Sequence, residues 1–193
     1  MVIGAVSERD TGEATRARIV EVALELIADR GFAATTTREI SERLGFTKAA
    51  LYYHFRTKDD LLAAIVAPAM SELEALVEHV GPVTEPTVRC SVLAGYVDLV
   101  AGHADLVRVL SADPAVRHSP ALAGAMPLYE RLARLLAGAE APGTTDRVRV
   151  RAALGAVHAA LEHAEPDEDP AVVRSATLAA ACGALGVPVP KAG

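Results

Sequence analysis

Apolar side chains recur at every third or fourth position in the first part of the chain, the period of a helix with one buried face. The run from Glu13 to Arg30 has this period, and Gly31 ends it. Its apolar positions are Ile19, Val22, Ala23, Leu26 and Ile27. Residues 1–12 show no period, so we expect a flexible N-terminal arm there.

Two short helices are predicted next. Thr36 and Glu39 have the spacing of a capping box, in which each side chain bonds the backbone N–H of the other residue, and the helix they begin ends at Gly45. Lys48–Phe55 then makes about two further turns. Two short helices joined by a tight glycine-containing turn are the pattern of a helix-turn-helix unit.

A long helix is predicted from Lys58 towards Val80, with Thr57 as its N-cap. Pro68 lies inside this run and lacks the N–H that a helix interior requires. We therefore expect a kink or a break near Val66–Ala67.

Proline and glycine residues divide the rest of the chain into further helices. These run from Glu85 to about Gly102, over Ala104–Ala112, from Pro120 to about Ala137, from Gly143 to about His163, and from Pro170 to Gly183 or Gly186. No window alternates with the period of a strand. The pattern predicts an all-α protein with about nine helices.

The composition agrees with helix packing. Hydrophobic residues make up 51% of the chain but aromatic residues only 4%, so the apolar side chains are mainly Ala, Val and Leu. Cys90 and Cys182 are too few for a disulfide framework or a four-cysteine zinc site. The first residues lack the basic and apolar regions of a signal peptide, and no uncharged stretch reaches the roughly 18–20 residues of a membrane span. We expect a cytoplasmic protein in a reducing compartment, without a membrane partner.

No signature of an enzyme or cofactor site is present: the sequence has no GxGxxG, P-loop, GxSxG or HExxH motif. His158 and Glu162 share a helical face and suit a metal ion, but a solvated pair is the ordinary interpretation. We expect no catalytic activity, no cofactor and no metal.

The charge is unevenly distributed along the chain. The net charge is −6, but residues 1–60 carry 9 Lys and Arg against 10 Asp and Glu, whereas residues 61–193 carry 10 against 15. A neutral N-terminal part beside an acidic remainder permits DNA binding only if its basic side chains gather on one face.

The second helix of the helix-turn-helix unit has the composition of a DNA-reading helix. Leu51 and Phe55 are one turn apart and are expected to face the core. The remaining surface carries Lys48, Ala49, Tyr52 and Tyr53. Phenols suit phosphates and base edges, and an alanine methyl suits a thymine methyl. As alternatives, Tyr52 packs locally, and His54 caps a helix C-terminus.

This segment resembles the tetracycline-repressor (TetR-type) family of transcriptional regulators, over about residues 13–65. The resemblance is carried by Gly31-Phe32, Thr36-Thr37-Arg38, Ile40, Leu44-Gly45, Leu51-Tyr52-Tyr53-His54-Phe55, Lys58 and Leu61-Leu62. It implies a helix-turn-helix DNA-binding domain over 13–57 and an effector-binding and dimerisation domain over 58–193. It also implies a homodimer on a pseudo-palindromic operator, and usually a repressor released by a small ligand.

By position, the resemblance implies two sets of DNA contacts. The phosphate contacts are Thr37, Tyr53 and Lys58, and the groove-facing residues are Arg38, Lys48, Ala49, Tyr52 and His54. Family members often have a visibly basic DNA-binding domain. This chain does not, so we expect modest affinity that depends steeply on salt.

The remaining helices suggest an effector site and a dimer contact. Tyr96, His103, Met126 and Tyr129 lie on apolar helix faces that suit a small, mostly apolar effector, although each is also an ordinary core residue type. The last two helices, about 145–163 and 170–185, are rich in Ala and Gly, which favours a four-helix dimer contact over packing within one monomer. Two other functions remain open: a small-molecule-binding helical protein that has lost operator binding, and a transcriptional activator.

Overall fold

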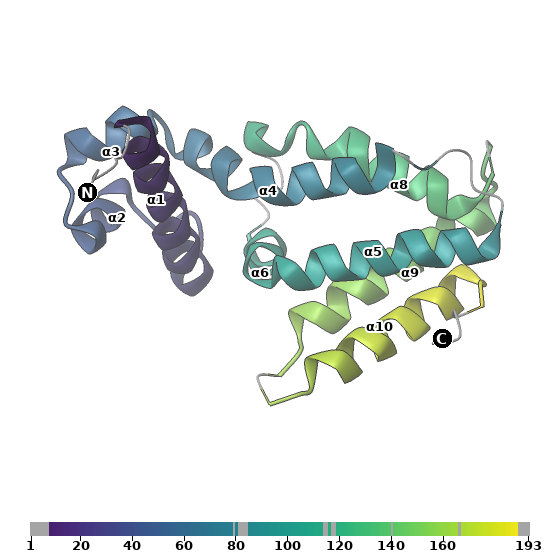
Figure 1. Ribbon diagram of the computed structural model, residues 1–193. Coiled ribbons are helices and arrows are strands. Elements are labelled where there is room, and N and C mark those ends of the chain that lie inside the picture. Colours follow the sequence, from purple (N-terminus) through teal and green to yellow (C-terminus); the bar gives the residue numbers. More distant parts are fainter. Residues whose placement is uncertain are drawn as a thin grey trace, which may run out of the picture. The chain divides into compact units, whose positions relative to one another are not determined.

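The computed structural model describes residues 8–78, 80, 85–113, 116, 119–139, 141–165 and 167–188. In chain order its elements are α1 (Glu8–Arg30), α2 (Thr37–Leu44), α3 (Lys48–His54), α4 (Lys58–Glu78), α5 (Pro86–Gly102), α6 (Ala104–Ala112), the 3-10 turn η1 (Pro120–Leu122), α8 (Ala125–Ala137), α9 (Thr144–Glu162) and α10 (Pro170–Leu185). These residues contain nine α-helices and no β-strand (Figure 1), which confirms the predicted all-α fold class.

The chain divides into two compact units. The first, the head unit, contains the residues up to Ala67 together with Arg108–Leu122. The second, the body unit, contains Pro68–Val107 together with the residues from Ala123 onward. The division between Ala67 and Pro68 therefore falls inside α4.

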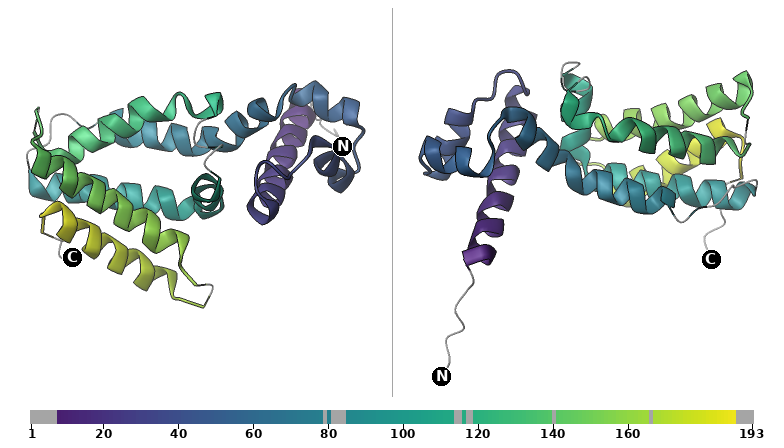
Figure 2. Two further views of the ribbon diagram at one scale, coloured as in Figure 1. Left: turned by 180° about the vertical axis from the view of Figure 1, so that it is seen from behind. Right: turned by 90° about the horizontal axis from the view of Figure 1, so that it is seen from above.

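The head unit is built on α1, α2, α3 and the first part of α4 (Figure 2). Its largest fully buried side chains are Ile19, Ile27, Ile40, Leu51, Leu61 and Leu62. Thr36 Oγ1 accepts a hydrogen bond from the Glu39 N–H, and the Glu39 carboxylate accepts one from the Thr36 N–H at 2.8 Å. The predicted capping box at the start of α2 is therefore confirmed.

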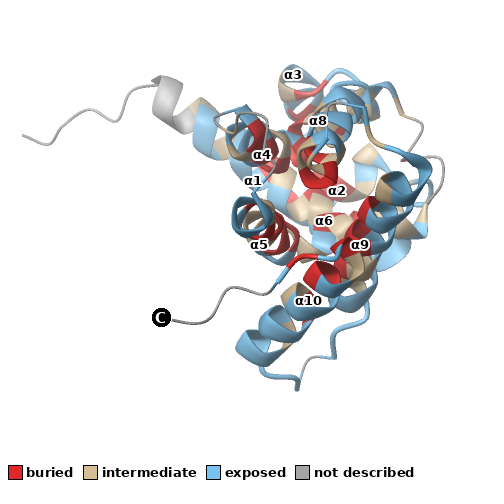
Figure 3. Ribbon diagram, turned by 90° about the vertical axis from the view of Figure 1, so that its right-hand side faces the viewer, coloured by how far each residue is buried: buried red, intermediate tan, exposed pale blue. Residues whose placement is uncertain are grey.

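The body unit has its own core. α10 packs against both α9 and α5, and α8 contacts α9 and α5. The buried residues lie on the sides of these helices that face one another, while much of the opposite side of α10 is exposed (Figure 3). The largest fully buried side chains are Val77, Leu93, Leu132, Leu136, Leu154 and Leu185.

α1 begins at Glu8 rather than at Glu13, so the predicted arm over residues 1–12 is wrong for residues 8–12. This first turn carries no apolar period, which is why hydrophobic spacing did not detect it. Residues 1–7 lie outside the described part.

A kink or a break was predicted near Val66–Ala67, and α4 is continuous through Pro68, so the break does not occur. Proline removes one backbone hydrogen bond, the one that would reach the Ala64 carbonyl. Val66 and Ala69 are 2% and 3% exposed, so buried packing on both sides of the proline holds the helix.

The single helix predicted from Pro120 to Ala137 is also wrong. The structure has the short turn η1, a break at Ala123–Gly124, and then α8. The physical reason is Pro127, which a helix beginning at Pro120 would place in its interior. Beginning at Ala125 places Pro127 in the first turn, where its missing N–H has no partner within the helix.

A disulfide bond joins Cys90 of α5 to Cys182 of α10, and both cysteines are fully buried. The two residues are 92 positions apart in the sequence. In the loop-closure account, a disulfide across about 100 residues stabilises a fold by about 4.7 kcal/mol, mainly by restricting the unfolded chain. The sequence analysis did not predict this bond between α5 and α10, and the bond does not agree with the expected reducing compartment, where disulfides are rare.

One polar pair lies within the body core. The Tyr96 hydroxyl, in a side chain that is only 4% exposed, is 2.8 Å from Nε2 of His158. Burial lowers the pKa of His158, and the Glu162 carboxylate opposes this by a smaller amount. Burial, with a smaller effect from Tyr129, raises the pKa of Tyr96. The folded protein therefore favours neutral His158 bonded to neutral Tyr96.

This pair predicts that the body is less stable in mild acid. The pKa of His158 is lower in the folded state than in the unfolded chain. Neutral His158 therefore contributes fully to the free energy of unfolding above about pH 6.5, the pKa of an unfolded histidine. The contribution is lost as the pH falls through the folded pKa. In urea unfolding, the free energy of unfolding should fall less between pH 7.5 and pH 5 in H158Q than in wild type. Glutamine can form a hydrogen bond but does not titrate.

The control is H163Q, which alters an exposed histidine at the C-terminal end of α9. This variant should keep the wild-type difference between the two pH values. An H158Q protein with the wild-type difference would contradict the prediction.

Candidate nucleic-acid interface

The turn between α2 and α3 is fixed by backbone hydrogen bonds. Gly45 has φ 70°, a conformation that side-chain-bearing residues rarely adopt, and its N–H donates to the carbonyls of Glu42 and Ser41. The Phe46 N–H donates to the Ser41 carbonyl at 2.8 Å. Thr47 then caps α3 by accepting a hydrogen bond from the Ala50 N–H at 3.2 Å. This chemistry sets the direction in which α3 leaves α2.

The rotation of α3 about its own axis is set by two buried side chains. Leu51 is 0% exposed and Phe55 is 2% exposed, as predicted. The Arg16 guanidinium lies over the Phe55 ring, 4.9 Å from its centroid. The other side of α3 is left to solvent.

That exposed side carries most of the predicted DNA contacts. Lys48 and Ala49 are exposed, and Tyr52 and Tyr53 are 40% and 86% exposed. The Tyr53 and His54 rings meet edge to face, with centroids 5.3 Å apart. An aromatic side chain as exposed as Tyr53 contributes almost nothing to the fold.

A contact from α2 extends this surface. The Thr37 and Tyr52 hydroxyl oxygens are 3.5 Å apart, and Nζ of Lys48 lies 5.6 Å from the centroid of the Tyr52 ring. We call the group Thr37, Lys48, Ala49, Tyr52 and Tyr53 the α3 surface. It presents hydroxyls, an ammonium, two aromatic rings and a methyl group, all of which suit phosphates and base edges.

Arg38 is exposed beside this surface but is paired. Its Nε lies 2.7 Å from the Glu42 carboxylate one turn later on α2. The hydrogen bond to Glu42 raises the pKa of Arg38 above its ordinary value. The sequence analysis did not pair Glu42 with Arg38, although the four-residue spacing of these opposite charges on one helix was a visible signal for the pair.

Lys58 is held within the head unit. Its Nζ donates a hydrogen bond to the Phe32 carbonyl and lies 4.2 Å from the centroid of the Phe32 ring. Burial lowers the pKa of Lys58, and the nearby Asp113 and Asp59 carboxylates oppose this. The Phe32 contact is a tertiary one that no local spacing revealed. The phosphate contact suggested for Lys58 stays a prediction.

The four residues suggested for effector binding have separate environments. Tyr96 bonds His158, as described above, and Nε2 of His103 lies 3.2 Å from the Glu72 carboxylate. Met126 is 59% exposed, and Tyr129 is half-buried against the core. A pocket between α8 and α9 is lined by other residues. The effector role of these four residues stays a prediction.

α9 and α10 pack on each other, and each also has an exposed face of small residues. The exposed small residues are Ala152, Gly155, Ala159 and Ala160 on α9 and Ala176, Ala179, Ala180 and Gly183 on α10. Two larger apolar side chains, Val148 and Val172, are 50% and 61% exposed on the same helices. Packing within one monomer therefore uses only part of the small-residue surface.

The described residues contain neither a clustered metal site nor a single membrane-spanning helix. No group of three or more His, Cys, Asp or Glu side chains there is arranged to hold a metal ion. No single described helix is long and apolar enough to cross a membrane, although the consecutive helices α5 and α6 reach that length together.

Comparison with known proteins agrees with the geometry of the head unit. Residues 19–65 match the family described as "Bacterial regulatory proteins, tetR family". The tetracycline repressor protein class C of Escherichia coli is 46% identical over 50 residues, which are 26% of this chain and 23% of the repressor. The chain spans only 16% to 34% of the length of these curated relatives.

The fold as a whole matches solved structures. KstR2 of Mycobacterium tuberculosis, a ketosteroid transcriptional regulator, has a TM-score of 0.69 at 16% identity, over 96% of this chain and 97% of that protein. AibR, solved with isovaleryl coenzyme A and operator DNA, has a TM-score of 0.62 at 20% identity, over 85% of this chain and 96% of AibR. Residues 19–65 are therefore similar to the helix-turn-helix segment of the tetR family of bacterial regulatory proteins, and the chain as a whole has the all-α fold of these solved regulators.

Proposed function

We propose that this protein is a transcriptional repressor that binds a pseudo-palindromic operator as a homodimer and is released by a small ligand. The observation that carries the proposal is the α3 surface. Tyr53 is 86% exposed on a helix whose opposite side, Leu51 and Phe55, is almost completely buried. A short helix fixed in this way presents one side to a major groove.

The proposed contacts divide by chemistry. Thr37, Tyr53 and Lys58 bind phosphates, and Arg38, Lys48, Ala49, Tyr52 and His54 face the groove. The contact between the Thr37 and Tyr52 hydroxyls supports this division, because it joins a phosphate contact on α2 to a base contact on α3. Residues 13–57 form the DNA-binding domain, and residues 58–193 bind the effector and form the dimer. The protein acts in the cytoplasm, where its operator lies, and has no enzymatic activity.

Release by a ligand requires two states of the link between these domains. AibR, which has a similar fold, was crystallised with both a coenzyme A thioester and operator DNA. In this chain α4 is the link, and Pro68 lies where the compact units divide. A ligand that favours one arrangement of α4 changes operator affinity by its differential affinity for the two states.

The two tyrosines test the DNA contacts. In a salt-titrated binding assay with DNA from upstream of its own gene, Y52A should lose about 10–100-fold in affinity for the operator and much less for unrelated DNA, because a groove contact carries sequence information. Y53A should weaken binding to both DNAs by a similar factor, because a phosphate contact does not. V88A, which truncates an exposed valine on α5, is the control. Sequence-independent binding that neither tyrosine variant changes would refute the proposal.

Glu42 should restrain DNA binding, since it neutralises Arg38 and places a carboxylate beside the α3 surface. E42Q should therefore bind the operator more tightly than wild type, most clearly at low salt, where charge effects are largest. E25Q makes the same charge change at an exposed position on α1 and should have a smaller effect. Equal effects of E42Q and E25Q would mean that only the net charge matters.

The dimer contact is testable at a glycine. A Cβ atom added at Gly155 on the exposed face of α9 meets nothing within 4 Å in the monomer, and a long side chain there can extend into solvent, so G155R should fold normally. At the proposed interface it should produce a monomer in analytical ultracentrifugation and weaken operator binding. G102R, at an equally open glycine on α5, should remain dimeric. A dimeric G155R protein would place the subunit contact elsewhere.

A further inference from the structure

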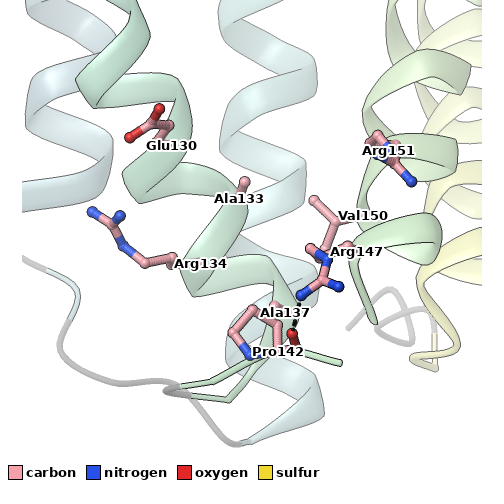
Figure 4. Close-up of a pocket in the computed structure, with 8 residues that line it drawn as sticks. All are labelled: Glu130, Ala133, Arg134, Ala137, Pro142, Arg147, Val150 and Arg151. Atoms are coloured by element: carbon pink, nitrogen blue, oxygen red, sulfur yellow. Dashed lines mark hydrogen bonds between the residues drawn. The ribbon is translucent and has the colours of Figure 1, made fainter. Parts of the chain in front are cut away.

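The body unit contains a pocket at the ends of two helices, where α8 finishes and α9 begins. It has a volume of about 280 Å³ and is formed by α8, α9 and Pro142 in the segment that joins them. Figure 4 shows the α8 side chains on one side of the pocket and the α9 side chains on the other. The lining residues are Glu130, Ala133, Arg134, Ala137, Pro142, Arg147, Val150 and Arg151. This volume is close to the lower end of the range for small-molecule sites.

The wall of the pocket is mostly apolar, but its charged groups are mostly positive. Ala133, Ala137, Pro142 and Val150 supply carbon atoms, and the methylene groups of the arginines extend this apolar wall. The charged lining side chains are three arginines and one glutamate. An apolar wall with excess guanidinium groups selects a ligand that is both hydrocarbon and anionic.

Arg147 is already oriented. Its Nη1 donates to the Pro142 carbonyl at 2.7 Å, and its Nη2 donates to the Thr144 hydroxyl at 3.2 Å (Figure 4 shows the first bond). A guanidinium has five N–H groups, so three remain available. Neither acceptor is charged, so the positive charge of Arg147 is not neutralised by these bonds.

The other two arginines add charge without a competing partner. Arg151 follows Arg147 by one turn on the same face of α9, and Arg134 belongs to α8. Among the described residues, the side chains of Arg134 and Arg151 have no hydrogen-bond or ion-pair partner. The same side of α9 therefore presents the guanidinium of Arg147, which is held by hydrogen bonds, and that of Arg151, which is free to reorient.

We propose that the pocket between α8 and α9 binds a small amphiphilic anion. The hydrocarbon part lies against Ala133, Ala137 and Val150, and a carboxylate or phosphate head is held by Arg147, with Arg134 and Arg151 contributing charge. These residues differ from the four suggested earlier for an apolar effector. The site does not depend on operator binding and is testable without DNA.

Isothermal titration calorimetry on the full chain tests the proposal with three probes: octanoate, octyl phosphate and the uncharged octanol. At least one of the anions should bind about tenfold or more tightly than octanol, because a hydrogen bond to a charged group is worth more than one to a neutral group. The better anion identifies the head group. Inorganic phosphate, which has no hydrocarbon part, should bind more weakly than octyl phosphate.

Variants locate the site. R134Q/R151Q should weaken binding of the anionic probe about tenfold or more, and A133L should weaken all three amphiphiles by filling the pocket. R149Q removes a neighbouring exposed arginine of α9 that does not line the pocket and should bind like wild type. Circular dichroism and the melting temperature check that each variant folds.

Three results would overturn the proposal. The first is that neither anion binds. The second is that octanol binds as tightly as the anions, which would remove the role of the arginines. The third is an equal loss of affinity in R149Q and R134Q/R151Q, which would show attraction to the overall charge of α9 rather than a site. If R134Q/R151Q does not fold, the affinities of R151Q and A133L for the anionic probe still test whether it binds in this pocket.

Discussion

Burial of Leu51 and Phe55 is the constraint on which the head unit depends. α3 has only seven residues, far too few for an isolated helix to be stable in water, so packing supplies its stability and sets its rotation. Once these two side chains lie in the core, Lys48, Tyr52 and Tyr53 must face outward. The left-handed Gly45 and the Thr47 cap fix the remaining freedom, which is the direction of the helix axis. The α3 surface is thus a geometric consequence of two apolar side chains.

The body unit is organised differently, by a few long-range polar and covalent links across an apolar core. The disulfide joins α5 to α10, the Arg174 guanidinium bonds both Asp98 carboxylate oxygens between the same helices, and Arg89 Nε reaches the Leu136 carbonyl at the end of α8 at 2.7 Å. Ala, Val and Leu side chains differ little in shape, so a core built from them specifies the helix packing only weakly. These links therefore help to fix the positions of the helices relative to one another. They also leave the outer faces of α9 and α10 available for other contacts.

Local features were predictable where the signal lies within a few residues. The capping box of α2 and the inward side of α3 follow from spacing and residue type, and the end of α10 is Gly186, one of the two glycines predicted. The errors have equally local causes. The first turn of α1 lacks an apolar period in its sequence, and Pro127 requires a helix start later than the one predicted at Pro120.

The sequence by itself determined the all-α class, the helix-turn-helix unit and the residue types on its outer surface, because a helical period and a short motif are properties of neighbouring residues. Only the tertiary structure decided which distant groups meet. It paired Cys90 with Cys182, Tyr96 with His158 and Lys58 with Phe32, and it formed the α8–α9 pocket from segments on both sides of a turn. Such contacts depend on how helices pack, and many packings are compatible with the same periodicity.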